Sequence, residues 1–238
     1  MPRRRRGREL GRRPGFTLTE IAVVLGVIGT IIAGIWTIAG DANESRKEAD
    51  ALMQAQTISS GVINFRQGRA FPASVPAGTN ITAMMANAQA IPASYINTTT
   101  GAIDNPWSMG APDTMQLIAG VWVDVAHANL GIEMYAMSAR TFRLSFYQVS
   151  QAGCAALLSQ LTACDPTMSG CPVAAYTALA GNYCQPGQTN CPTTSAGSAV
   201  MSANAATWRS MPASVISLMC AANSYTGGGN SVEFDYSL

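Results

Sequence analysis

The feature that most constrains this chain is an uncharged apolar run of nineteen residues, Ile21 to Ala39, close to its N-terminus. An α-helix needs about 20 such residues to cross the hydrocarbon core of a bilayer. The run therefore predicts one membrane-spanning helix. Arginines precede the run and the mixed-charge stretch DANESRKEAD follows it, which predicts a cytoplasmic N-terminus and an exported C-terminal part.

The basic residues are concentrated before this run. Residues 1–15 hold seven of the fourteen basic residues but only one of the thirteen acidic ones, Glu9. An arginine-rich tail could bind nucleic acid or direct nuclear import, but this one abuts an apolar segment. From residue 16 onward acidic residues outnumber basic ones, so we predict no nucleic-acid partner for the body of the protein.

Between the arginines and the apolar run lies the segment Gly15-Phe16-Thr17-Leu18-Thr19-Glu20. A secretory signal would end in a small-residue cleavage site, and residues 40–42 offer only a weak one. Glu20 instead places a carboxylate at the edge of the apolar run, where burial without a partner is costly. This carboxylate is therefore either an interfacial group held at the headgroups or the partner of a cation from another chain.

The segment RRPGFTLTEIAVVLGVIGTIIAG resembles the class III signal of type IV pilins and pseudopilins, with its basic leader, Gly-Phe junction and glutamate at the fifth mature position. The resemblance implies that a prepilin peptidase removes residues 1–15 by cutting after Gly15, and that it methylates the new amine of Phe16. The span is then kept. In the assembled filament, the Phe16 amine and Glu20 of a neighbouring subunit would neutralise each other.

The same resemblance implies the partners and the location of the protein. Its partners would be further copies of the chain in a helical homopolymer, the prepilin peptidase, and an assembly platform with its ATPase. The precursor would lie in the inner membrane with its N-terminus in the cytoplasm and its head in the periplasm. The mature protein would be part of an extracellular pilus.

A second apolar pattern continues beyond the span. Ala51, Ala55, Ile58, Val62 and Phe65 recur at spacings of four and three, which is typical of one face of an amphipathic helix. We therefore predict one helix over residues 16–66. Its residues 16–40 would serve the membrane and assembly, and residues 41–66 would pack on a globular head, residues 67–238.

Four glycines, Gly26, Gly29, Gly34 and Gly40, interrupt the helix-forming pattern of the span. Each costs about 1 kcal/mol of helix propensity relative to alanine. They are either small residues for close helix packing or, as the resemblance allows, a segment from Gly26 to Gly34 that loosens on assembly.

The head has the pattern of an α+β domain. After a long loop with a short helix at 81–90, we predict strands at 115–125, 132–138, 140–149 and 231–237, and helices at 150–161 and 205–222. A long helix against an antiparallel sheet is the type IV pilin fold. The order of Asn105-Pro106-Trp107, a sheet and then Cys154 in a short helix resembles the type IVb branch, including conjugative pilins. The fifteen-residue leader fits that branch, whereas Phe16 in place of Met departs from many of its members.

All six cysteines lie in the last third of the chain, which indicates an oxidising compartment. Two segments repeat the pattern C-x-P-x4-C-P. Six cysteines allow 15 connectivities. The matching loops favour two local disulfides and leave a long one, whereas a zinc site would use closer spacing and disagrees with export. The expected pairs are Cys164 with Cys171, Cys184 with Cys191, and Cys154 with Cys220.

No catalytic motif is visible, because the chain has one histidine, His127, and no HExxH, GxSxG or phosphate-binding loop. We therefore expect neither an enzyme nor a cofactor. Three functions remain: a pilus subunit for adhesion, conjugation or aggregation, a type II secretion pseudopilin, or a membrane-anchored adhesin or enzyme with an uncleaved signal anchor. The major pseudopilin usually binds calcium near its C-terminus, and Glu233 and Asp235 are too few carboxylates to argue for that.

Overall fold

The computed structural model describes residues 17–98, 101–107, 115–118, 121–124, 131–165, 168, 170–178, 200–204, 209–221 and 230–238. The chain forms two compact units, Met1–Asn43 and Glu44–Leu238. We call the second unit the head. The first helix, α1 (Leu18–Arg66), contributes to both units, and its end agrees with the helix that the sequence predicts.

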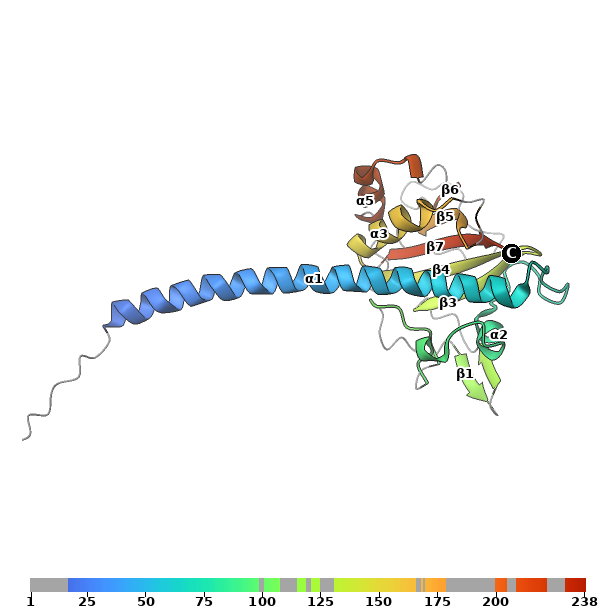
Figure 1. Cartoon of the computed structure of the whole chain (residues 1–238), viewed down its shortest axis with the longest axis horizontal. Coiled ribbons are helices and arrows are strands. Elements are labelled where there is room, and N and C mark those ends of the chain that lie inside the picture. Colours follow the sequence, from blue (N-terminus) through green and yellow to red (C-terminus); the bar gives the residue numbers. More distant parts are fainter. Residues whose placement is uncertain are drawn as a thin grey trace, which may run out of the picture. The chain divides into compact units, whose positions relative to one another are not determined.

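The head combines the last turns of α1 with short helices and two antiparallel sheets (Figure 1). Its helices are α2 (Thr82–Asn87), η1 (Ala93–Tyr95), α3 (Gln151–Thr162) and α5 (Ala213–Ala221), and its strands are β1 (Met115–Ile118), β2 (Val121–Asp124), β3 (Ile132–Ser138), β4 (Thr141–Val149), β5 (Pro172–Ala178), β6 (Val200–Asn204) and β7 (Asn230–Ser237).

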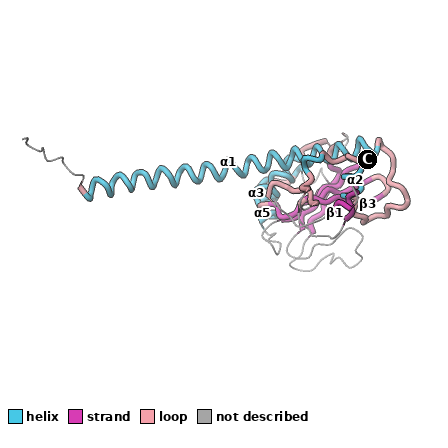
Figure 2. The backbone as a smooth tube through the Cα atoms, turned by 90° about the horizontal axis from the view of Figure 1, so that it is seen from below, coloured by secondary structure: helices cyan, strands magenta, loops and turns pink. Residues whose placement is uncertain are grey.

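The larger sheet has the order β3-β4-β7-β5-β6, and every pair in it is antiparallel. The last strand, β7, therefore lies between β4 and β5, although more than 50 residues separate it from β5 in sequence. The head part of α1 covers one face of this sheet (Figure 2). The predicted α+β fold, a long helix on an antiparallel sheet, is confirmed.

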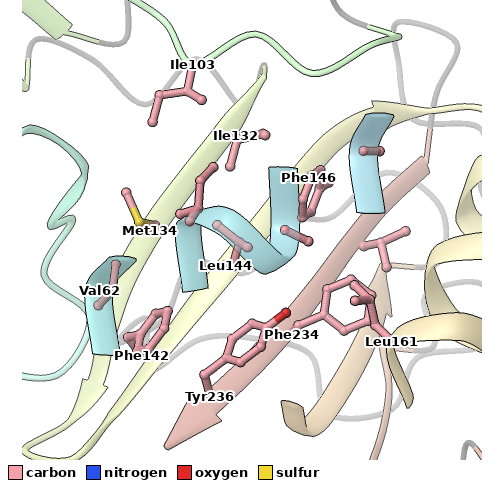
Figure 3. Packing of buried hydrophobic residues seen from close by; sticks show 14 of the residues in the cluster. Val62, Ile103, Ile132, Met134, Phe142, Leu144, Phe146, Leu161, Phe234 and Tyr236 are labelled. Carbon is pink, nitrogen blue, oxygen red and sulfur yellow. The ribbon is translucent and has the colours of Figure 1, made fainter. Parts of the chain in front are cut away.

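Alternation along β4 and β7 creates the core. Phe142, Leu144 and Phe146 on β4 lie opposite Tyr236, Phe234 and Val232 on β7. These six side chains are buried and join one cluster with the α1 stripe Ala51, Ala55, Ile58 and Val62 (Figure 3). The rings of Phe142 and Tyr236 are stacked with centroids 5.3 Å apart. The predicted stripe of α1 is thus the part of the helix that packs on the sheet.

Four expectations about the head need correction. Phe65 does not belong to the buried stripe, because the apolar spacing runs one turn beyond the part of α1 that the sheet covers, and its side chain is 46% exposed. Residues 115–125 form two strands of a separate hairpin, with Ile118 paired to Val121, and not one strand of the main sheet. The helix predicted at 205–222 is interrupted at Met211 and Pro212, between helical residues 209–210 and α5, which begins at Ala213.

The start of α5 and the position of β5 complete these corrections. Pro212 cannot donate a backbone hydrogen bond inside a helix. Its carbonyl instead accepts the first bonds of α5, from Val215 and Ile216. The sequence pattern predicts a disulfide loop that ends at Cys171 and no strand at 172–178. In the structure this loop leads directly into β5.

Candidate functional site

The N-terminus of α1 is closed by three reciprocal hydrogen bonds between Thr17 and Glu20. The Glu20 carboxylate accepts from the Thr17 backbone N–H at 2.8 Å and from the Thr17 hydroxyl at 3.0 Å, and the Thr17 hydroxyl accepts from the Glu20 N–H at 3.3 Å. This arrangement is a capping box, for which T-x-x-E is the sequence signal. Gly15 and Phe16 lie outside the described residues.

The capping box is a role of Glu20 that the sequence reading missed, although Thr17-Leu18-Thr19-Glu20 carries the signal for it. It fixes the carboxylate beside the backbone amide of Thr17, the residue that directly follows Phe16. In the isolated chain the Glu20 side chain therefore has a partner within its own helix.

The apolar part of α1 in the N-terminal unit exposes its large side chains. Relative exposure ranges from 45% at Ile28 to 88% at Leu18. Within the described residues, α1 is the one helix long and apolar enough to cross a membrane. An added Cβ at Gly26, Gly29, Gly34 or Gly40 would meet nothing within 4 Å. Among the residues that the structure describes, no contact therefore requires glycine at these four positions.

At the start of the head, Glu44 joins three segments. One carboxylate oxygen, Oε1, accepts from the Trp107 indole N–H at 2.8 Å and also from the Ser150 hydroxyl. The Ser150 hydroxyl in turn accepts from the Gly153 N–H at 3.0 Å and so caps α3. An added Cβ at Gly153 would lie 2.2 Å from the Trp107 ring. Glu44 and Gly153 together fix Trp107, which packs against the edge of the core.

The face of the sheet opposite α1 carries a buried ion-pair cluster. On β4, Arg143 Nε donates to Asp235 Oδ1 at 2.6 Å and Arg143 Nη1 donates to Glu233 Oε2 at 2.8 Å. Both carboxylates come from β7, and all three residues are buried. Glu233 and Asp235 are thus partners of a guanidinium. In the part of the chain that the structure describes, no group of three His, Cys, Asp or Glu side chains could hold a metal ion.

Two disulfides hold the C-terminal part of the head. The structure pairs Cys154 of α3 with Cys220 of α5, and Cys164 with Cys171. The third expected pair, Cys184 with Cys191, lies outside the described residues, as does His127. Arg209 supports the same region, because its side chain donates to the carbonyl of Thr162 at the end of α3 at 3.1 Å and also to the carbonyl of Cys164. A cation at this position suits the negative end of the α3 dipole.

Comparison with known proteins gives a distant likeness among solved structures. No family model and no curated protein matches the sequence. Among solved structures, a type IV b pilin from Salmonella typhi is similar to this chain with 15% sequence identity and a TM-score of 0.40. The match covers 79% of this chain and 98% of that one.

Proposed function

We propose that this chain is a structural subunit of a type IV pilus-like filament, polymerised through α1. The observation that carries the proposal is the exposed apolar half of α1, which directly follows the basic leader, the Gly15-Phe16 junction and the capped Glu20. A prepilin peptidase would remove residues 1–15 and methylate Phe16. Residues 16–40 would then hold the protein in the inner membrane until an assembly platform and its ATPase add the subunit to an extracellular filament.

The energetics of such an assembly do not come mainly from the hydrophobic effect. Lipid tails are as apolar as the side chains of α1, so moving the helix from the bilayer into a helix bundle gains little from apolar burial. Close packing and polar pairs between helices therefore provide most of the free energy of association. This chain offers both features. The four glycines of the span leave room for another helix, and Glu20 offers a carboxylate near the new N-terminus.

The finer assignment to the type IVb branch, with a role in adhesion, conjugation or aggregation, is part of the proposal. It is supported by the fifteen-residue leader and by the position of Asn105-Pro106-Trp107 before the sheet. In the structure this tripeptide is anchored at both ends. The Asn105 amide donates to the carbonyls of Gly131 and Tyr147, and Trp107 donates to Glu44.

The first test is the mature N-terminus. Mass analysis of purified filaments or membranes should find a chain that begins with methylated Phe16. A chain that begins at Met1, or near Ala42 after an ordinary signal cleavage, would refute the processing step. A start at Met1 would return the protein to the class of anchored adhesins or enzymes, whereas a start near Ala42 would mean that the apolar run is removed.

The second test separates the local role of Glu20 from its role between subunits. Glu20→Gln keeps a side chain that can complete the capping box but removes the charge. Thr17→Ala weakens the capping box but keeps the charge. If Glu20 neutralises the Phe16 amine of a neighbour, Glu20→Gln should abolish filaments, because an unpaired buried charge costs about 3 to 5 kcal/mol at every subunit. Thr17→Ala should lose only about 1 kcal/mol of helix stability and still form filaments.

Leader cleavage and membrane level are measured in parallel for both variants. Normal filament number and length with Glu20→Gln as the only subunit would show that the carboxylate acts at the membrane headgroups or as a helix cap, and not between subunits.

A further inference from the structure

Two uncharged segments of the head pack against each other. Residues 51–65 of α1 and residues 70–103 contain no charged residue, although the rest of the head carries both signs. The two segments approach closely at Gly61, because a Cβ added there would lie 2.0 Å from the Ala90 carbonyl oxygen. Glycine at position 61 therefore lets the loop after α2 lie directly against α1.

A hollow of about 510 Å³ lies along this contact. It is lined by α1 and by the loop after α2, and its polar side chains are Gln56, Thr57, Ser60, Asn64 and Gln89. In the part of the chain that the structure describes, none of these five side chains forms a hydrogen bond or an ion pair. The hollow therefore offers three amides and two hydroxyls to a ligand, all of them neutral.

A second hollow of about 390 Å³ adjoins the first, because Gln89 and Pro92 line both. Its lining is mainly apolar and consists of Ala86, Ile91, Pro92, Ala93 and Ile96, with the amide side chains of Asn87 and Gln89. Ile91 and Ile96 are buried and form an apolar floor. The second hollow therefore combines a surface for a small apolar group with amides that can bind polar atoms beside it.

Gln89, which lines both hollows, stands where a glycine is usual. Its φ of +56° lies in the left-handed region. The Gln89 N–H donates to the Ala86 carbonyl at 3.0 Å. The Ala90 N–H donates to the Met85 carbonyl at 3.0 Å, which completes a Schellman motif at the end of α2. Glycine would avoid the steric cost of this conformation, and residues held in it cluster at sites that hold ligands.

We propose that the two hollows form one binding site for a neutral oligosaccharide of N-acetylhexosamine units. Sugar hydroxyls would exchange hydrogen bonds with the amides and hydroxyls of the first hollow. The acetamido group of a neighbouring unit would occupy the second hollow, with its methyl group on Ile91 and Ile96 and its polar atoms beside Gln89. Pro92, between the two hollows, would offer its ring to the C–H face of the sugar.

The same lining disfavours other classes of ligand. An anionic chain, such as a nucleic acid or a sulfated glycan, needs cationic side chains to bind its charges, and neither hollow has one. An extended peptide binds by adding a strand to the edge of a sheet. Both hollows are lined by helices and loops and by no strand.

This inference goes beyond the proposed function and does not require polymerisation, because every residue that lines the two hollows belongs to the head of one chain. It can therefore be tested on the unassembled protein. A failure of the site would leave the filament subunit intact, and a chain without filaments could still bind the sugar.

Calorimetric titration of the full-length protein, in a detergent without a sugar headgroup, measures the binding. Chitotriose, the neutral trimer of N-acetylglucosamine, should bind, and its affinity should be the same at low and high salt because no charges are involved. Cellotriose, which has the same linkage but no acetamido groups, should bind at least about five-fold more weakly, the factor of one lost hydrogen bond.

Gln89→Gly separates a ligand site from a purely structural role. The variant removes the amide but keeps a residue that suits the left-handed backbone, so its melting temperature should not fall. Its affinity for chitotriose should fall about five-fold. Gln67→Gly is the matched control, because Gln67 is an exposed glutamine with a φ of +49° that lines neither hollow. It should bind chitotriose like the wild type.

A second variant tests the α1 side of the site. Gln56→Ala with Asn64→Ala removes two exposed amides and should weaken binding about 20-fold. Sedimentation with purified cell-wall glycan identifies the source of the sugar: retention of the wild-type protein would assign it to the bacterial wall, and chitotriose binding without retention would assign it to a glycan outside the wall.

Three results would overturn the inference. They are no binding of chitotriose by the wild-type protein, equal binding of chitotriose and cellotriose, and unchanged affinity in Gln89→Gly.

Discussion

Replacement of Arg143 should destabilise the head more than any other single charge change in the described structure. Its guanidinium donates three hydrogen bonds to the carboxylates of Glu233 and Asp235, at 2.6, 2.8 and 3.0 Å. Arg143→Met keeps an unbranched apolar stem but leaves both carboxylates buried without this cation. Removal of one partner of a buried ion pair costs about 3 to 5 kcal/mol.

Thermal unfolding of the full-length protein in detergent measures this loss. For a unit of the size of the head, 1 kcal/mol corresponds to about 2 to 4 °C in melting temperature, so Arg143→Met should lower the melting temperature by about 6 to 20 °C. Near-ultraviolet circular dichroism follows the transition with the disulfides intact.

Two further variants decide whether the unpaired buried charge causes the lower melting temperature of Arg143→Met. Arg46→Met removes an arginine whose side chain is 83% exposed, and it should cost no more than about 0.5 kcal/mol. Adding Glu233→Gln and Asp235→Asn to Arg143→Met should recover much of the loss, because neither β7 side chain is then a buried carboxylate that has lost its guanidinium partner. A loss below about 1 kcal/mol for Arg143→Met alone would refute the reasoning.

Three other changes have definite expected results. Gly61→Ala would place its Cβ 2.0 Å from a backbone carbonyl oxygen, so it should lower stability by about 1 to 3 kcal/mol, measured by the same melting experiment; unchanged melting would contradict the close contact. Opening the disulfide between Cys154 and Cys220, 66 residues apart, with a double Ser variant should cost about 4 kcal/mol in the chain-entropy model, as denaturant titration can check. Because burial and Glu44 raise the pKa of Glu48, this carboxylate favours its protonated form in the folded head, and its contribution to stability is lost as pH rises through that raised pKa. Glu48→Gln should therefore weaken the dependence of melting temperature on pH at pH values just above the ordinary pKa of a glutamate. An unchanged dependence would show that Glu48 does not cause it.

The sequence alone determined the parts of this protein that depend on local pattern. The apolar run, the four-and-three spacing after it and the end at Arg66 specify α1, because helix periodicity needs only neighbours within a few turns. Alternation in TFRLSFYQV likewise predicts β4, and the segment after the glycines at 227–229 predicts β7. The Thr17–Glu20 capping box was equally readable, since it spans one helical turn.

The tertiary structure decided which distant segments meet. Position 143 pairs with position 235 because β7 enters the sheet between β4 and β5, and no local pattern specifies the order of strands in a sheet. The same holds for Glu44, whose partners Trp107 and Ser150 follow it by 63 and 106 residues. A charged residue between apolar neighbours on a strand indicates a solvent-facing side chain. Its burial beside an opposite charge is a property of the pairing of two strands, and only the folded chain provides that pairing.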